Sequence, residues 1–89
     1  MIQQAITISN RLGLHARASA KLTKLAGSFP CEVWVTRGSR RVNAKSIMGV
    51  MMLAAGIGTE ITLETSGERE DEAMQALLAL INDKFGEGE

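Results

Sequence analysis

The chain has 89 residues, 45% of them hydrophobic and only 3% aromatic, and its ten basic residues balance ten acidic ones. This size predicts a single domain, residues 1–89, and the zero net charge and few aromatic rings disfavour nucleic-acid binding, which needs a basic surface and stacking platforms. The lone Cys31 excludes an internal disulfide, and no apolar run approaches the roughly 18 residues of a membrane span, so we expect a cytoplasmic protein without membrane insertion.

The spacing of apolar residues predicts elements in the order β-α-β-β-α-β-α. In chain order these are a strand at 2–8, a helix at 16–26, strands at 31–36 and 41–44, a helix at 46–53, a strand at 60–65 and a helix at 68–85. Gly27 and Gly86 are expected to end the first and last helices, because glycine is the usual stop residue. Short connections and one shared core favour an α+β fold, an open-faced two-layer sandwich whose four-stranded sheet is covered on one face by the helices. The sequence pattern does not fix the strand order.

The zero net charge hides an uneven distribution along the chain. Residues 1–45 hold eight basic residues and one acidic residue, a charge of +7, and residues 46–89 hold two basic and nine acidic residues, a charge of −7. Either the two halves interleave in space and their fields cancel, or the basic half forms a face that steers acidic partners. Composition does not choose between them.

The only histidine, His15, lies where the loop at 9–14 meets the first predicted helix. Histidine is a poor helix cap, so the first N–H groups, those of Ala16 and Arg17, are left as donors for an anion. A phosphoryl group on a ring nitrogen of His15 would lie over these amides, with the Arg17 guanidinium available for charge-assisted hydrogen bonds. The positive helix end also disfavours imidazolium, so we expect an uncharged ring with a lone pair for attack. The alternative is an exposed or locally bonded loop histidine without chemistry.

Other catalytic or cofactor sites find little support in the sequence. One histidine and one cysteine do not supply a typical zinc site, so we expect no metal. A nucleophilic pair of Cys31 and His15 would need a strand-start thiol to meet a loop histidine, which nothing in the sequence indicates. The short "GIG" at 56–58 follows a helix and precedes a strand, the wrong order for a nucleotide fingerprint, so we expect no cofactor.

Two further groups of residues are candidates for partner docking. Lys21 and Lys24 follow Arg17 at helical spacing, which fits a solvated helix face as well as a docking surface. The helix at 46–53 is too short to bury all its large apolar residues, and flexible thioethers suit a surface that fits several partners, although apolar residues at helical spacing usually face a core. The apolar candidates are Ile47, Met48 and Met51. Ser46 is a sound N-cap and also a position where a phosphate would place a dianion beside them.

The segment "GLHARASAKL", followed about thirty residues later by "KSIMGVMML", resembles the HPr family of phosphocarrier proteins of the bacterial sugar phosphotransferase system. The resemblance extends over nearly the whole chain. It implies an antiparallel sheet of order 1-4-2-3 and a monomeric carrier that is not an enzyme by itself.

The resemblance also implies roles for single residues. His15 would accept phosphate on Nδ1 from phosphorylated enzyme I and pass it to enzyme IIA domains, with Arg17 bracing the phosphate. Ser46 would be the site of a regulatory serine kinase. The shared docking face would consist of Lys21, Lys24, Ile47, Met48 and Met51.

Two positions depart from the family pattern. Ala18 stands where the family usually has proline. The difference leaves the chemistry intact, and the protein loses at most ~0.4–1 kcal/mol of the stability that proline would give by restricting the unfolded chain. "NRLG" at 10–13 stands where many members have asparagine–proline, as in the nitrogen-related paralogue NPr, whereas "KSIMGVM" resembles HPr more. We therefore expect a sugar-branch carrier, with the nitrogen branch as the alternative, or a regulatory binder controlled at Ser46.

Overall fold

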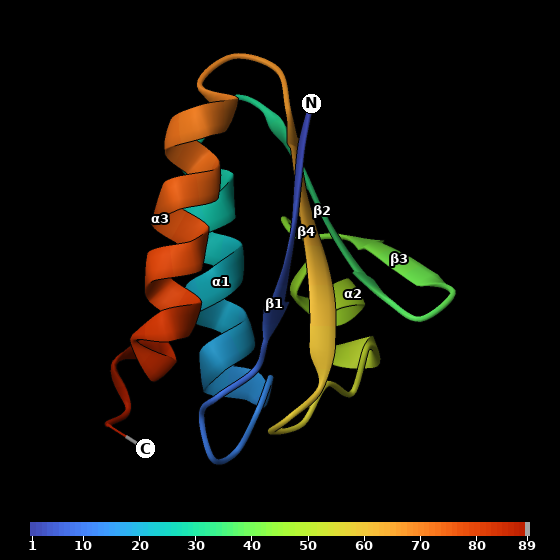
Figure 1. Ribbon diagram of the computed structural model, residues 1–89, viewed down its shortest axis with the longest axis vertical. Coiled ribbons are helices and arrows are strands. Elements are labelled where there is room, and N and C mark those ends of the chain that lie inside the picture. The colour runs from blue at the N-terminus through green and yellow to red at the C-terminus, as the bar shows by residue number, and fades with distance from the viewer. Residues whose placement is uncertain (89) are drawn as a thin grey trace.

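The computed structural model describes residues 1–88, and the predicted helices and strands occur in the predicted order (Figure 1). The strands are β1 (Ile2–Thr7), β2 (Glu32–Arg37), β3 (Arg40–Asn43) and β4 (Glu60–Ser66). The helices are α1 (Ala16–Gly27), α2 (Ile47–Met52) and α3 (Glu70–Asn82), followed by a short 3₁₀ turn at Lys84–Gly86. None of the helices within residues 1–88 is long and apolar enough to cross a bilayer.

The strands form one sheet in the order β1-β4-β2-β3, with every neighbouring pair antiparallel. This confirms the order that the family resemblance implied. The central strand β4 pairs with β1 on one side, placing Ile6 opposite Ile61, and with β2 on the other, placing Val35 opposite Leu63. Alternate residues of β4, beginning with Ile61 and Leu63, are buried, so one face of the sheet builds the core, as the strand periodicity predicts.

The helices cover that one face, and α1 runs antiparallel to α3 beside it (Figure 1). Each helix buries a stripe of residues against the sheet: Ala18, Leu22 and Ala26 in α1, and Ala73, Leu77 and Ile81 in α3. The beginning of α1 and the end of α3 therefore lie at the same end of the molecule, and the N-terminus of the chain lies at the opposite end. This arrangement places the loop before α1 beside the segment that follows α3.

Two expected helix ends are wrong. Gly27 is the last residue of α1 rather than a left-handed stop, because the chain leaves the helix through a tighter turn in which the Ser28 N–H donates to the Leu25 carbonyl (3.1 Å). The last helix ends at Asn82, three residues before the predicted end. Lys84 and Phe85 then adopt left-handed conformations, with φ of +53° and +55°, before Gly86 at +74°.

This left-handed turn is held by Phe85 and Lys21. The Phe85 side chain is completely buried, and its carbonyl oxygen accepts a hydrogen bond from Lys21 Nζ at 2.6 Å. Non-glycine residues at positive φ are strained, so the burial of the ring and this bond to α1 offset the cost. The segment after α3 is thereby fixed against α1.

We predict that Phe85→Ala lowers the free energy of unfolding by about 3–5 kcal/mol, since it empties a fully buried site. Urea titration followed by circular dichroism measures the loss. Met48→Ala, at an exposed position of α2, is the control and should change stability by no more than about 0.5 kcal/mol. A Phe85→Ala protein as stable as the control would contradict the anchoring role of the ring.

Candidate functional site

The loop that precedes α1 is fixed by Asn10 and Gly13. The fully buried Asn10 donates from Nδ2 to the Gly13 carbonyl oxygen (2.8 Å), and the Leu14 N–H donates to the Ala55 carbonyl oxygen (2.9 Å). Gly13 has φ of +64°, and a Cβ at this position would lie 2.5 Å from the Ala55 oxygen, so only glycine fits. These contacts fix the conformation of the loop and therefore the position of the His15 backbone.

His15 is the N-cap of α1, with extended backbone angles of φ −74° and ψ −179°. Its carbonyl accepts the Ser19 N–H (2.8 Å), whereas its side chain makes no capping bond. The N–H groups of Ala16 and Arg17 consequently have no acceptor within the helix. Helix α1 starts directly after His15, as predicted, and the His15 side chain is 27% exposed, so solvent reaches the ring.

Within residues 1–88, the close partner of the His15 ring is Glu87, which follows the 3₁₀ turn. His15 Nε2 lies 2.5 Å from Glu87 Oε2, and the second carboxylate oxygen, Oε1, accepts from Asn10 Nδ2 at 3.0 Å. Partial burial opposes ionisation, but the hydrogen bonds from Asn10 and His15, together with the nearby charges of His15 and Lys21, lower the pKa of the Glu87 carboxyl. An ionised carboxylate only accepts hydrogen bonds, so Nε2 carries the proton and donates it. Nδ1 has no partner within residues 1–88.

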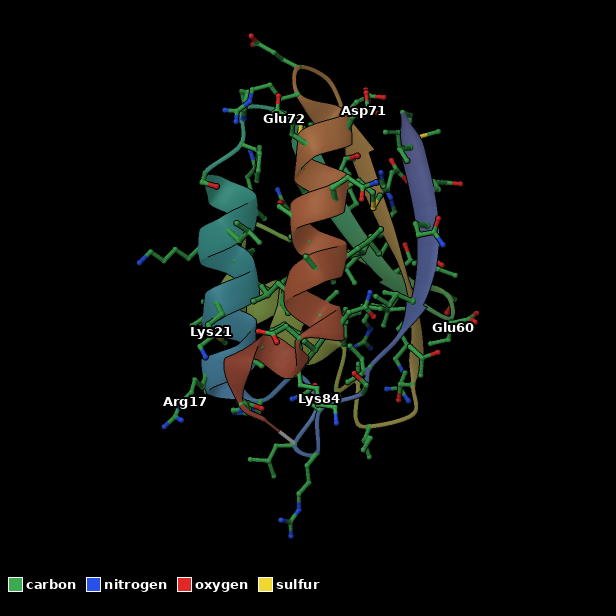
Figure 2. All side chains as sticks on the ribbon, turned by 60° about the vertical axis from the view of Figure 1, so that its left-hand side comes forward. Arg17, Lys21, Glu60, Asp71, Glu72 and Lys84 are labelled. Atoms are coloured by element: carbon green, nitrogen blue, oxygen red, sulfur yellow. The ribbon has the colours of Figure 1, made fainter. Side chains whose placement is uncertain are left out.

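A surface hollow of about 620 Å³ collects several predicted site residues around His15. Its lining is Arg11, Leu12, His15, Ala16, Arg17, Lys21, Gly86 and Glu87. Figure 2 shows Arg17 extending away from the beginning of α1, with Lys21 one turn further along the helix. Lys24 is also exposed, but it does not line the hollow.

The apolar residues of α2 face solvent rather than the core. Ile47, Met48, Met51 and Met52, here called the α2 patch, are 38%, 66%, 39% and 61% exposed, and Val50 is the buried residue of this helix. The structure thus decides between the two interpretations of these residues in favour of a surface patch. Because α2 packs beside α1, the α2 patch lies on the helix next to the one that His15 caps.

Ser46 is the N-cap of α2, as predicted. Its Oγ accepts the Gly49 N–H at 3.2 Å, and the side chain is exposed. The serine is therefore structurally useful as a cap and at the same time accessible to another protein.

The two ends of the helical layer differ in charge, although the basic and acidic halves of the chain also meet, as in the ion pair of Arg41 with Glu64 (2.9 Å). Figure 2 shows Arg17 and Lys21 at the end that holds the hollow, and Asp71 and Glu72 at the opposite end, where α3 begins. Acidic residues in a first helical turn are stabilised by the positive end of that helix, which accounts for their position. Around His15 the two halves meet, because Arg11, Arg17 and Lys21 of the basic half line the same hollow as Glu87 of the acidic half.

The geometry agrees with what comparison with known proteins finds. A family described as "PTS HPr component phosphorylation site" matches residues 2–83. The chain belongs to the HPr family. It is 67% identical to the phosphocarrier protein HPr of Cupriavidus necator and 63% identical to that of Neisseria meningitidis serogroup A, each over 89 residues and the full length of both proteins. It is a phosphocarrier of the phosphotransferase system.

Solved structures of the HPr family share the fold. A crystal structure of HPr-C-His from Thermoanaerobacter tengcongensis superposes with a TM-score of 0.95 at 44% identity and covers 98% of each chain. Another crystal structure from that organism is described as an HPr dimer, with a TM-score of 0.79 over 98% of this chain. A more distant relative, phosphocarrier protein NPr of Shewanella violacea, is 42% identical over 97% of this chain.

Sequence reasoning missed two residues of this HPr-family site, Glu87 and Asn10. Glu87 is 72 residues from His15 in the chain, and among nine acidic residues in the second half nothing in the pattern marks it. Asn10 stands in a loop where asparagine is common for its turn-forming ability, so its residue type indicates no contact with a distant carboxylate.

We predict that Glu87 stabilises the fold in a pH-dependent way. Its pKa in the folded state is below the ordinary value of 4.5, so its contribution is fully present above that value and is lost as the pH falls through the lowered pKa. The difference in free energy of unfolding between the wild type and Glu87→Gln should therefore shrink on acidification below about pH 5. Urea titrations from pH 3 to pH 7 (a range set by the carboxyl pKa) measure it, with Asp83→Asn as the matched control. A difference that grows on acidification would contradict the assignment.

Proposed function

We propose that this protein carries a phosphoryl group on His15 Nδ1, which it accepts from phosphorylated enzyme I and donates to enzyme IIA domains for sugar uptake and its regulation. The observation that supports this most strongly is the state of the ring. His15 Nε2 is bonded to Glu87, and Nδ1, which has no partner within residues 1–88, lies at the beginning of α1. Phosphorylated enzyme I, whose own donor is phosphoenolpyruvate, would present its phosphoryl group to that atom.

The beginning of α1 and Arg17 are suited to stabilise the transferred group. The Ala16 N–H has no acceptor among residues 1–88 and points from the positive end of the helix, where an anion gains roughly 0.3–1 kcal/mol at an exposed site. The Arg17 guanidinium lines the same hollow and can form charge-assisted hydrogen bonds with phosphate oxygens. This modest stabilisation suits a carrier, since a group that must be passed on should not be bound tightly.

The α2 patch, with Lys21 and Lys24 on α1, would form the surface that enzyme I and the IIA domains share. Exposed methionines adapt to differently shaped partners, and the lysines would steer acidic ones. The two lysines differ, however: Lys24 is exposed, while Lys21 also holds the Phe85 carbonyl and so has a structural role as well. Lys24 is therefore the better candidate for a purely docking residue.

The open hollow fits a carrier that acts only together with its partner enzymes, because a transient partner needs a small, accessible interface. From the resemblance to HPr carriers we infer a monomer that works in the cytoplasm. Ser46, exposed at the start of α2, is positioned for a regulatory serine kinase.

The nitrogen-related branch is the alternative, supported by the 42% identity to an NPr and by the sequence at 10–13. The higher identities, 67% and 63%, are to proteins named HPr, and they favour the sugar branch. Transfer rates from the phosphorylated protein to a sugar-specific and to a nitrogen-related IIA domain from the same cell separate the two branches.

We predict that incubation with enzyme I and phosphoenolpyruvate puts one acid-labile phosphate on the wild-type protein and none on His15→Ala, since His15 is the only histidine in the sequence. Intact-mass spectrometry at neutral and acidic pH measures the phosphate, and circular dichroism verifies that the variant is folded. Arg17→Ala is the graded control and should still accept phosphate, at a reduced rate. Label on folded His15→Ala would refute the assignment.

We predict that Ser46→Asp raises the KM for acceptance from enzyme I several-fold, because the new charge must be desolvated beside the α2 patch when enzyme I binds. Aspartate is itself a good N-cap, so the helix is retained. Ser46→Ala loses the cap without adding charge and is the matched control. Equal KM values for Ser46→Asp and the wild type would count against docking at this surface. If Ser46→Asp raises the KM and His15→Ala still binds enzyme I as the wild type does, the result would favour a regulatory binder.

A further inference from the structure

The contact between Glu87 and His15 has the arrangement of a carboxylate that supports an imidazole nucleophile. Glu87 Oε2 accepts from His15 Nε2 at 2.5 Å, and the Glu87 side chain is only 13% exposed. Its other oxygen is held by Asn10, which is completely buried and is fixed in turn to the Gly13 carbonyl. The carboxylate is therefore bonded through both oxygens and supported by a second residue that is itself immobile.

The segment that carries Glu87 is also held in place independently of His15. The burial of Phe85 and the bond from Lys21 to its carbonyl fix the chain two residues earlier. A flexible tail that touched the ring by chance would show neither the buried anchor nor the bond through each carboxylate oxygen.

We propose that Glu87 is a positioning residue for phosphoryl transfer, which holds the His15 ring by its Nε2–H and stabilises the positive charge that the ring acquires at the moment Nδ1 is phosphorylated. This proposal rests on the proposed carrier function and adds to it a residue that acts through His15.

The step balances without a further reactant. The Nδ1 lone pair forms the new N–P bond while the bond between phosphorus and the donor group of phosphorylated enzyme I breaks and returns its electron pair to that group. The proton on Nε2 stays in place, so the His15 ring becomes cationic during the attack, and the Glu87 carboxylate 2.5 Å away compensates that charge. In the reverse direction, the same proton makes the ring a better leaving group for transfer to the next acceptor.

The other charged groups around the ring keep the carboxylate from repelling the incoming phosphate. Arg11, Arg17 and Lys21 line the same hollow as His15 and Glu87. Phosphate would bind at Nδ1, on the side of the ring away from Nε2, and would meet these cations and the first amides of α1. The two anions are thus separated by the imidazole ring.

The first measurement tests the contact in the unphosphorylated protein and does not depend on any transfer activity. In full-length ¹⁵N-labelled protein, the wild-type Nε2 proton should be visible by NMR, because a hydrogen bond to a carboxylate slows its exchange with water. The signal should disappear in Glu87→Ala and remain, shifted, in Glu87→Gln, whose amide oxygen still accepts. Asp83→Asn removes an exposed carboxylate from the same segment and should leave the signal unchanged.

The second measurement separates the hydrogen bond from the charge. With phosphorylated enzyme I as donor, kcat/KM should fall about tenfold in Glu87→Ala, the effect of losing one charge-assisted hydrogen bond. Glu87→Gln should recover part of this loss, since it restores the bond but not the charge, and Asp83→Asn should match the wild type.

The outcomes distinguish this proposal from the carrier function itself. If the wild type accepts no phosphate, the carrier function fails, while the ring signal still reports on the contact. If Glu87→Ala loses the ring signal but transfers phosphate as fast as the wild type, the contact is only structural. If the variant transfers phosphate faster, the contact slows transfer, and either result overturns the proposal. An unchanged ring signal in Glu87→Ala also overturns it.

Discussion

The antiparallel packing of α1 and α3 against one face of the sheet is the constraint on which the site depends. It brings the first residues of α1 and the segment after α3 to one end of the molecule, although they are about seventy residues apart in the chain. Phe85 closes this end by burying its ring, and Lys21 ties the same turn to α1. Without this packing, His15 would still begin a helix, but no carboxylate would stand beside its Nε2.

The fold was predictable because its elements follow local rules. Period-two alternation in β4 and a buried stripe in α1 gave the correct types of structure, and a serine hydroxyl correctly marked the start of α2. The errors lie at helix ends, where tertiary contacts override local preference. Phe85 adopts a left-handed conformation that buries its ring, and no pattern of neighbouring residues indicates that burial would outweigh the backbone strain.

The site was predictable in part, for the same reason. His15, Ala16 and Arg17 are consecutive, so a single helix start places the ring, an amide and a guanidinium together. Glu87 and Asn10 reach the ring only through the packing of distant segments, which a single sequence does not encode in any local motif. The position of the α2 patch was likewise open until the structure showed that α2 has room to bury Val50 but not its methionines.

The positions of Met1 and Glu87 at opposite ends of the molecule have a practical consequence for studies of partner binding. The N-terminal amine lies at the far end of the molecule, in an exposed ion pair with Glu70 (3.1 Å), whereas the residues near the C-terminus border the hollow at His15. An affinity tag or a fluorescent label attached to Met1 costs one exposed ion pair and leaves the end that holds the hollow clear. A bulky group attached at Glu87 would instead stand at the rim of the hollow beside the His15 imidazole, where it would hinder access to the ring.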